Sequence, residues 1–334
     1  MTEEYTRRGP QPRYLLWLAL AGVLSLIAVA VTVAGSAAEA KSVRGGQETI
    51  EYVVPAQPPE GVVYDQRTKA FYGGSVSDGT LYRGTLDDPT AEVFLPAGAP
   101  GGRTEAVGVN VDKEGRLYVA GGSTGALFVY DIETKEQVAR FDTGAGGFIN
   151  DVTVTKKGDV YFTDSFRPFI YKATAEQVEA GGGVPEAISL APEVNYGPGT
   201  QNPASPFNAN GIRATQNGKY VIFADTNDGK LYRLETATDE IREIRVQGQT
   251  DNPDGLELRG RTLYVVDNQN ELIVEVRLSG DSLEGRVVSN TTSPEFHTPT
   301  TVSIAGGRLL VANAEFFDQS EAGPPYYVVS IPRP

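Results

Sequence analysis

The chain has 334 residues and a formal net charge of -14, with 29 lysine and arginine residues against 43 aspartate and glutamate residues. Nucleic acids and anionic membranes are bound by basic surfaces, so this charge balance argues against both as partners. The chain has no cysteine and a single histidine, His297. Disulfides, thiol nucleophiles, thiolate zinc sites and mechanisms that need two histidines are therefore excluded.

Residues 1–40 have the pattern of an export signal. Three arginines precede an apolar run over residues 15–33, and a small-residue cleavage sequence ends at Ala40. This order is typical of a secretory signal, although a run of about 19 residues is also long enough to remain as an uncleaved membrane anchor. In both cases the basic N-terminal flank predicts that the remainder lies outside the cytoplasm. We expect a secreted protein in which residues 41–47 form a linker. The protein would contact the membrane only if its N-terminal segment stays uncleaved.

Residues 48–334 consist of repeated short strands, with one helical stretch at 173–180. In the third unit, residues 152–154, 160–163 and 169–172 alternate in polarity and are separated by Gly, Asn or Asp turns, as half-buried strands are. The unit recurs about every 45 residues, apart from one gap of about 60, and this period is typical of a propeller. The six units begin near Gly61, Val107, Asp151, Gly211, Gly255 and Thr300. We therefore predict an all-β fold, a six-bladed β-propeller.

The last unit has too few strands to complete a blade by itself. Its final strand, residues 326–331, gains a partner if the strand at 49–54, which precedes the first unit, pairs with it. Closure protects strand edges that would otherwise pair with other chains. We therefore expect the N-terminal strand to close the ring.

The long gap between the third and fourth units indicates an insertion of about 15 residues within 179–207. It contains Tyr196 and Phe207 among glycines and prolines. Such a segment is either a lid over a site or a variable surface loop.

One position of the repeat carries oxygen ligands in most units. The residues at this position are Glu60, Val107, Asn150, Asn210, Asp254 and Thr300. A single Asn or Asp here is commonly a turn residue that bonds its own backbone, but their occurrence in four equivalent places favours a shared site. Calcium accepts mixed carboxylate and amide oxygens, and two carboxylates balance a divalent charge. We predict one divalent cation, calcium, held by Glu60, Asn150, Asn210 and Asp254.

These residues stand in motifs that resemble the senescence marker protein, gluconolactonase and luciferin-regenerating enzyme family, a relative of diisopropyl fluorophosphatase. The motifs are Pro59-Glu60-Gly61, Asn150-Asp151-Val152, Asn210-Gly211-Ile212 and Pro253-Asp254-Gly255-Leu256. The resemblance covers roughly residues 58–315. It implies a six-bladed propeller with a divalent metal at its top, surrounded by the four residues named above.

From the site and the resemblance we expect an exported, metal-dependent hydrolase of a lactone or ester-type small molecule, acting as a monomer. The metal would polarise a carbonyl or phosphoryl oxygen and orient water, and Asp254 would act as general base or attack directly. Because a fold does not fix a function, two alternatives stay open. They are a non-catalytic, metal-stabilised binding propeller and a condensing enzyme similar to the strictosidine synthases.

The chain departs from the resemblance at one position. Sugar-lactone hydrolases of the family resemble one another in an arginine two residues before the first asparagine, where this chain has Phe148. This difference predicts a more apolar pocket, with Phe148, Phe207 and His297 as candidate substrate contacts. Aromatic residues are more often core residues, however, and the position of His297 just before Pro299 favours a turn or capping role.

Overall fold

The computed structural model describes residues 41–42, 49–196, 207–316 and 325–334. The predicted leader, residues 1–40, lies outside this part of the chain, as does most of the predicted linker. Among the described residues no helix is long and apolar enough to cross a membrane.

The described residues form five β-sheets and one short helix, α2. The first sheet contains β3 (Pro59–Asp65), β4 (Ala70–Ser75), β5 (Leu81–Thr85) and β6 (Glu92–Leu95). The second contains β7 (Val109–Val111), β8 (Arg116–Ala120), β9 (Ala126–Asp131), β10 (Gln137–Asp142) and β14 (Gly182–Gly183). The third contains β11 (Ile149–Val154), β12 (Val160–Asp164), β13 (Phe169–Ala173) and β15 (Glu186–Ser189). The fourth, with nine strands, contains β16 (Ala209–Ala214), β17 (Tyr220–Asp225), β18 (Lys230–Glu235), β19 (Ile241–Gln247), β20 (Pro253–Arg259), β21 (Thr262–Asp267), β22 (Leu272–Leu278), β23 (Glu284–Thr292) and β1 (Lys41–Ser42). The fifth contains β2 (Ile50–Val54), β24 (Pro299–Ala305), β25 (Arg308–Asn313) and β26 (Tyr326–Pro332).

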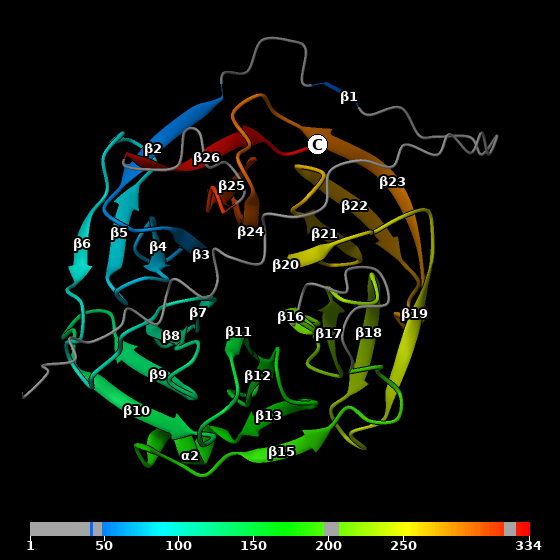
Figure 1. Cartoon of the computed structure of the whole chain (residues 1–334), viewed down its shortest axis with the longest axis horizontal. Helices are drawn as coiled ribbons and strands as arrows, with labels where there is room; N and C mark the ends of the chain where they lie inside the picture. The colour runs from blue at the N-terminus through cyan, green and yellow to red at the C-terminus, as the bar shows by residue number, and fades with distance from the viewer. Residues whose placement is uncertain (1–40, 43–48, 197–206, 317–324) are drawn as a thin grey trace, which may run out of the picture. The chain divides into compact units, whose positions relative to one another are not determined.

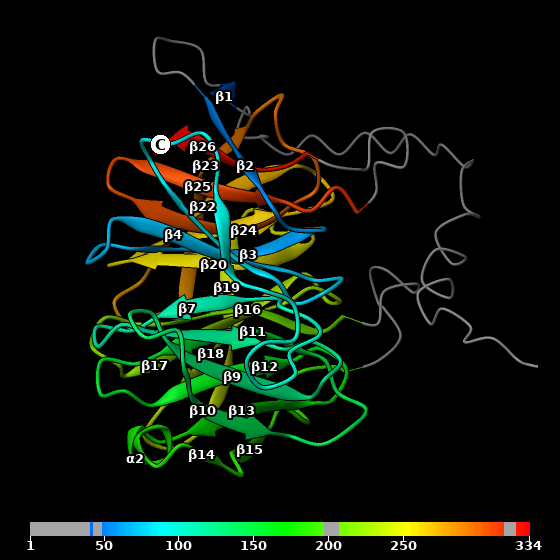
Figure 2. The ribbon, with the colours of Figure 1, turned by 90° about the vertical axis from the view of Figure 1, so that its left-hand side faces the viewer.

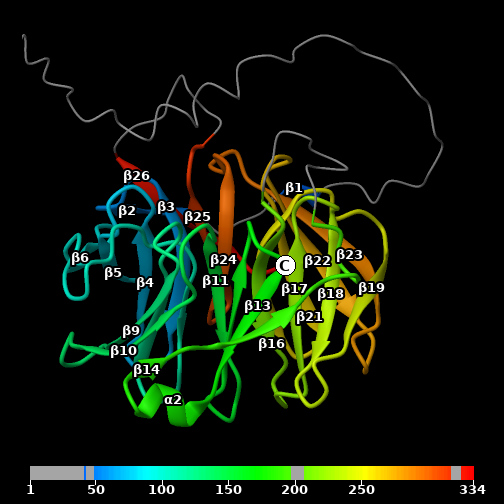
Figure 3. The ribbon, with the colours of Figure 1, turned by 60° about the horizontal axis from the view of Figure 1, so that its bottom comes forward.

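The sheets are arranged around a central axis in a propeller-like fold (Figure 1). Strands β3, β7, β11, β16, β20 and β24 lie innermost, and successive strands of each antiparallel meander lie farther out. Figures 2 and 3 show the strands from the side. In the nine-stranded sheet, two meanders join where their outer strands β19 and β23 pair in parallel. The prediction of an all-β, propeller-like fold is confirmed.

The first and last inner strands are neighbours. The Tyr64 main-chain N–H donates to the Ser303 Oγ at 3.0 Å, and the Thr300 hydroxyl donates to the Glu60 carbonyl oxygen at 2.8 Å. Strand β2 pairs antiparallel with β26 along its whole length, and Tyr52 is buried on it. Segments from both ends of the described chain therefore meet in one sheet.

The hydrophobic core is divided into layers between adjacent sheets. One layer joins Tyr118 and Phe141 of the second sheet to Phe162 and Tyr171 of the third. Because sheets cover both of their faces, middle strands such as β17 are buried at every position. The middle strands are therefore continuous apolar runs, whereas an alternation of polar and apolar residues was expected from the sequence.

The predicted helical stretch is the five-residue α2 (Ala175–Glu179). A capping box begins it, since Thr174 and Gln177 bond each other's main-chain N–H groups. Of the predicted insertion, β14 pairs with β10, β15 completes the third sheet, and the Tyr196 hydroxyl donates to the Asp164 carbonyl oxygen at 2.7 Å. These parts belong to the body of the fold. The remaining part, residues 197–206, lies outside the described residues.

Candidate functional site

Each candidate ligand is the second residue of its inner strand and lies in a β-bulge. On β11 the pairing register shifts between Ile149 and Val152, so that Asn150 and Asp151 together oppose the single residue Thr163. Equivalent shifts on β3, β16, β20 and β24 contain Glu60, Asn210, Asp254 and Thr300. A bulge bends its strand and changes the direction of the side chain. The sequence repeat thus corresponds to a repeated backbone irregularity at one end of the axis.

The residue after each candidate ligand approaches the backbone of the next repeat closely. A Cβ atom on Gly61 would lie 2.3 Å from the Val107 carbonyl oxygen, and one on Gly211 would lie 2.3 Å from the Asp254 carbonyl oxygen. Only glycine fits at such separations without displacing the neighbouring backbone. On β11 the equivalent residue is Asp151, whose side chain extends to β16 instead.

All four candidate ligands are buried, and three of them hold an oxygen without a partner. Their side chains are between 3% and 6% exposed. Glu60 Oε2, Asn150 Oδ1 and Asp254 Oδ1 make no hydrogen bond to any described residue. Buried polar atoms are nearly always satisfied, so three unsatisfied oxygens at equivalent positions are available as ligands for a bound group.

Hydroxyl groups fix the direction of the two candidate amides. The Asn150 Nδ2 donates to the Ser165 Oγ at 3.0 Å, and this hydroxyl donates onward to the Ala209 carbonyl oxygen at 2.7 Å. Asn210 bonds the Thr226 Oγ1 in the same way, at 3.0 Å, and Thr226 likewise donates to a main-chain carbonyl. A hydroxyl that has given its proton away can only accept, so each amide must present its nitrogen to the hydroxyl. The amide oxygen is left for the axis.

Asp254 is positioned by the equivalent residue of its own sheet. The Asn268 Nδ2 donates to Asp254 Oδ2 at 2.9 Å, which leaves Oδ1 as the oxygen without a partner. Ser165, Thr226 and Asn268 each come directly after the second strand of a meander. The sequence reasoning did not identify these three residues, although their constant place in the repeat could have indicated them.

The aspartates before these residues cap turns. Asp164 Oδ1 accepts the main-chain N–H groups of Phe166 and Arg167 at 3.0 and 3.1 Å. Asp225 Oδ1 accepts those of the residues two and three positions on in its own loop. This bonding is that of an Asx turn.

Burial makes the two candidate carboxylates difficult to ionise. It raises the pKa of Asp254 to about 7, although the hydrogen bond from Asn268 and the nearby Asn210 amide act in the opposite direction. Burial also raises the pKa of Glu60 well above its usual range, and Asp254 and Asp151 add to this effect, while Arg213 opposes it. Two acidic groups that repel each other in a buried site are the setting in which a bound cation is most stabilising.

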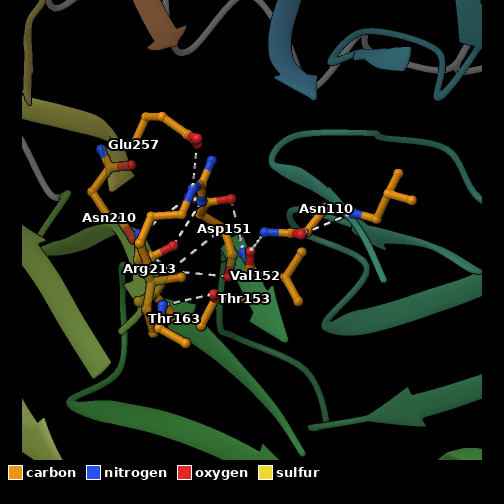
Figure 4. Close-up of polar contacts among 11 residues, drawn as sticks. Asn110, Asp151, Val152, Thr153, Thr163, Asn210, Arg213 and Glu257 are labelled. Carbon is orange, nitrogen blue, oxygen red and sulfur yellow. Dashed lines mark hydrogen bonds and ion pairs between the residues drawn. The ribbon is translucent and has the colours of Figure 1, made fainter. Parts of the chain in front are cut away.

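A buried ion-pair network lies beside the candidate ligands (Figure 4). Arg213 Nη1 contacts Asp151 Oδ2 at 2.8 Å, and Arg213 Nε contacts Glu257 Oε2 at 3.3 Å. The same Asp151 oxygen accepts the Ile212 main-chain N–H at 3.1 Å, and Asp151 Oδ1 accepts that of Val152 at 2.8 Å. Burial raises the pKa of Asp151, and these donors oppose the shift. The network links β11, β16 and β20, the strands that carry three of the candidate ligands.

The donor set and the charge fit a hard divalent cation. Four buried carboxyl groups interact here with one another and with a single guanidinium, that of Arg213; they belong to Glu60, Asp151, Asp254 and Glu257. When all five groups are ionised, four negative charges and one positive charge give the cluster a net charge of -3. No three acidic or imidazole groups in the described ranges gather closely enough to hold a metal. A cation here would therefore need the two amides as well. Such mixed oxygen ligation suits calcium.

Two of the three predicted substrate contacts lie in one cluster. The rings of Phe148 and Phe207 meet with centroids 5.3 Å apart, and Phe166, which was not among the predicted contacts, touches both. His297 precedes β24, where its N–H donates to Asn313 Oδ1 at 3.3 Å and its carbonyl oxygen accepts the Glu315 N–H at 3.0 Å. These main-chain bonds agree with a turn role for His297.

Comparison with known protein families identifies the fold and the motifs together. The family model described as the SMP-30/gluconolactonase/LRE-like region matches residues 58–299. The chain belongs to this family. The resemblance seen in the motifs is thereby confirmed, with a C-terminal limit slightly earlier than predicted. No curated protein matches the chain.

Several solved structures share the fold at low sequence identity. Regucalcin from Agrobacterium tumefaciens, described as a calcium-binding protein, has a TM-score of 0.60 and 14% identity, over 83% of this chain and 90% of that one. A gluconolactonase from Xanthomonas campestris gives 0.60 and 14%, over 84% and 87%. Virginiamycin B lyase from Staphylococcus aureus gives 0.56 and 11%, over 86% and 99%. At such identities the similarity shows the fold alone.

Proposed function

We propose that this protein is a divalent-metal-dependent hydrolase, of lactonase or esterase type. The observation that carries the proposal is the set of buried, unpartnered oxygens on Glu60, Asn150 and Asp254 at one end of the axis. Membership of a family named after gluconolactonase, and the likeness to a gluconolactonase and to a calcium-binding regucalcin, support it.

Glu60, Asn150, Asn210 and Asp254 would hold the cation, for which calcium is the best candidate. When bound, it would polarise the carbonyl oxygen of the scissile bond. Asp254 Oδ2 is held by Asn268, so Oδ1, which keeps a second lone pair beside the one it would give to the cation, would accept a proton from the attacking water. The water oxygen bonds the carbonyl carbon, the acyl C–O bond breaks, and Asp254 Oδ1 returns the proton to the leaving alkoxide oxygen.

The architecture behind this site is a six-bladed propeller closed by β2. The nine-stranded sheet counts as two blades, because its strand order runs through two complete meanders. The pairing of β2 with β26 supports closure by the N-terminal strand. Closure would keep the inner strands at fixed separations, on which the geometry of an axial site depends.

The substrate is a small molecule outside the cytoplasm, and the protein works as a monomer that binds no nucleic acid. Support for export comes from the leader pattern of residues 1–40, and the net charge of -14 supports the absence of polyanionic partners. An uncleaved leader would place the same domain on the outer face of a membrane.

The decisive experiment measures turnover of lactones, aryl esters and organophosphates with calcium and with a chelator. Asp254→Asn keeps the side-chain shape but removes the basicity, so kcat/KM should fall by about two to four decades while the protein stays folded. Asp267→Asn is the matched control, because that buried aspartate bonds Asn270 in the turn of the same sheet. It should change turnover little.

Two results would contradict the proposal. Turnover that survives both the chelator and Asp254→Asn would place the chemistry elsewhere. Calcium binding with no turnover across the panel would favour the binding propeller. Because lyases share the fold, the product mass must also show the addition of one water rather than elimination.

A further inference from the structure

Three phenylalanine rings form one cluster, named here the Phe triad: Phe148, Phe166 and Phe207. Phe148 and Phe166 have ring centroids 5.3 Å apart, Phe148 and Phe207 lie 5.3 Å apart at 89°, and Phe166 and Phe207 lie 5.4 Å apart. Each ring contacts the other two within the range of favourable aromatic pairs. All three residues remain partly exposed.

The Phe triad lies at the end of the fold that carries the candidate ligands. Phe148 directly precedes β11, and Phe207 lies two residues before the start of β16; the second residues of these strands are Asn150 and Asn210. Phe166 follows Ser165, the hydroxyl partner of Asn150. Since β12 runs antiparallel to β11, the end of β12 and the start of β11 are at the same rim.

Buried polar groups fix the backbone beneath the rings. Asp164, which is fully buried, accepts the main-chain N–H groups of Phe148 and Phe166 at 2.9 and 3.0 Å. The Asn208 Nδ2 donates to the Ser165 carbonyl oxygen at 2.9 Å, which ties the residue after Phe207 to the residue before Phe166. The three rings are therefore held in place by the fold and need not be ordered by a ligand.

The charged group adjacent in sequence to the Phe triad is bonded to the protein. Arg167 Nε bonds Asp164 Oδ2 at 2.7 Å, and its two terminal nitrogens bond the Thr143 carbonyl oxygen and hydroxyl at 2.9 and 2.6 Å. The guanidinium is thus engaged with the protein. A ligand group that reaches the Phe triad therefore contacts aromatic carbon. The Arg167 guanidinium is not available there to donate hydrogen bonds to hydroxyl groups of a ligand.

We propose that the Phe triad binds an alkyl or aryl substituent of the substrate, so that the substrates are apolar lactones or esters rather than polyhydroxylated sugar lactones. The inference rests on the proposed hydrolase function. Covering partly exposed ring surface with apolar substrate removes both from water, at a gain of roughly three- to fourfold in affinity for each added methylene.

Turnover of a homologous series tests the substrate class. With the parent protein, kcat/KM should rise from δ-valerolactone to δ-decalactone by at least tenfold, and should be lowest for glucono-δ-lactone. Phe148→Ala and Phe207→Ala should each reduce the ratio between the long and the short lactone by about tenfold, because δ-decalactone loses more turnover than δ-valerolactone. Phe169→Ala is the matched control, since that half-exposed ring packs on the same core layer but lies on β13, farther from the axis. It should leave the ratio unchanged.

A binding measurement separates this inference from the proposed function. Calorimetric titration with butanoate, hexanoate and octanoate needs no turnover, and affinity should rise along the series in the parent and stay flat in Phe148→Ala. If affinity rises along the series but no turnover is found, the inference that the Phe triad binds apolar groups stands and the proposed hydrolase function is rejected. Turnover or binding that is independent of chain length in the parent would overturn the inference, even if both alanine variants fail to fold. An equal loss in Phe169→Ala would also overturn it.

Discussion

The two carboxylate oxygens of Asp254 have different surroundings, and this difference determines what the residue can do. Oδ2 accepts the Asn268 amide, while Oδ1 is buried without a partner, and burial raises the pKa of Asp254 to about 7. In an unfolded chain an aspartate has a pKa of about 3.9. Between about pH 4 and pH 7 the unfolded chain therefore binds fewer protons, and the free energy of unfolding of the metal-free protein falls as the pH rises.

Calcium binding should depend on pH with the opposite sign. The cation requires ionised carboxylates, so its binding releases protons from Asp254 and Glu60, and its affinity should rise with pH between pH 5 and pH 7, below the pKa of Asp254. The rise should approach about tenfold per pH unit for each proton released. Calorimetric titration in buffers across this range measures the slope.

Two variants sharpen this test of the candidate ligands. Glu60→Gln removes one of the two protons, so it should weaken binding and flatten the slope. Asn150→Ala removes a neutral ligand, so it should weaken binding but keep the slope. A calcium affinity that is constant from pH 5 to pH 8, or the same slope in all three proteins, would show that these carboxylates do not bind the ion.

At this scale the types of the candidate ligands could be predicted from the sequence, but their surroundings could not. The repeat indicates Glu60, Asn150, Asn210 and Asp254, because local turn motifs recur at one position. Arg213 gives no such signal, since its partners Asp151 and Glu257 come from other inner strands, β11 and β20. Whether a buried oxygen lacks a hydrogen-bond partner likewise depends on which residues of other strands the fold brings next to it.

The β-bulge is the element that produces the site, and it depends on pairing across two strands. A sequence read in one dimension shows the motif Asn210-Gly211 but not the register shift on β16 in which Asn210 lies. The middle strands show a similar limit. Their continuous burial arises from the neighbouring sheets, and no local pattern contains it.

Strand β2 offers a prediction at the scale of one element. If it closes the ring, a chain that begins at Pro55 exposes the β26 edge and loses the buried Tyr52, whose ring lies 5.2 Å from that of Phe71. Loss of one large buried aromatic costs about 3–5 kcal/mol, which corresponds to a fall in Tm of roughly 10 °C. A chain that begins at Thr49 is the control and should melt like the parent.

Point variants on the same strand distinguish packing from truncation. Tyr52 is buried and Glu51 is exposed on the opposite face, so Tyr52→Ala should lower Tm strongly and Glu51→Ala by at most about 2 °C. Scanning calorimetry measures all four chains. If the chain beginning at Pro55 melts with the parent and stays monomeric, β2 has no part in closing the fold.

For the molecule as a whole, the period of the repeat was sufficient to predict an all-β propeller. It was sufficient because each meander is local in sequence, so turns and strands recur in the order in which they pair. The joining of β19 to β23, by contrast, brings together strands from successive repeats. The extent of such contacts is set by how the sheets twist against each other, which the sequence period does not specify.

Processing of the leader gives the last prediction, and it uses the composition of the whole chain. The only tryptophan is Trp17 and the only methionine is Met1, so cleavage after Ala40 removes both and leaves tyrosine as the sole fluorophore of the exported protein. Purified exported protein should show tyrosine emission alone and release no methionine on amino-acid analysis. Ala40→Leu, which blocks a small-residue cleavage site, should restore tryptophan emission and retain the protein in the membrane fraction. Tryptophan emission from the exported parent itself would contradict cleavage, and would show that residues 15–33 remain as an anchor.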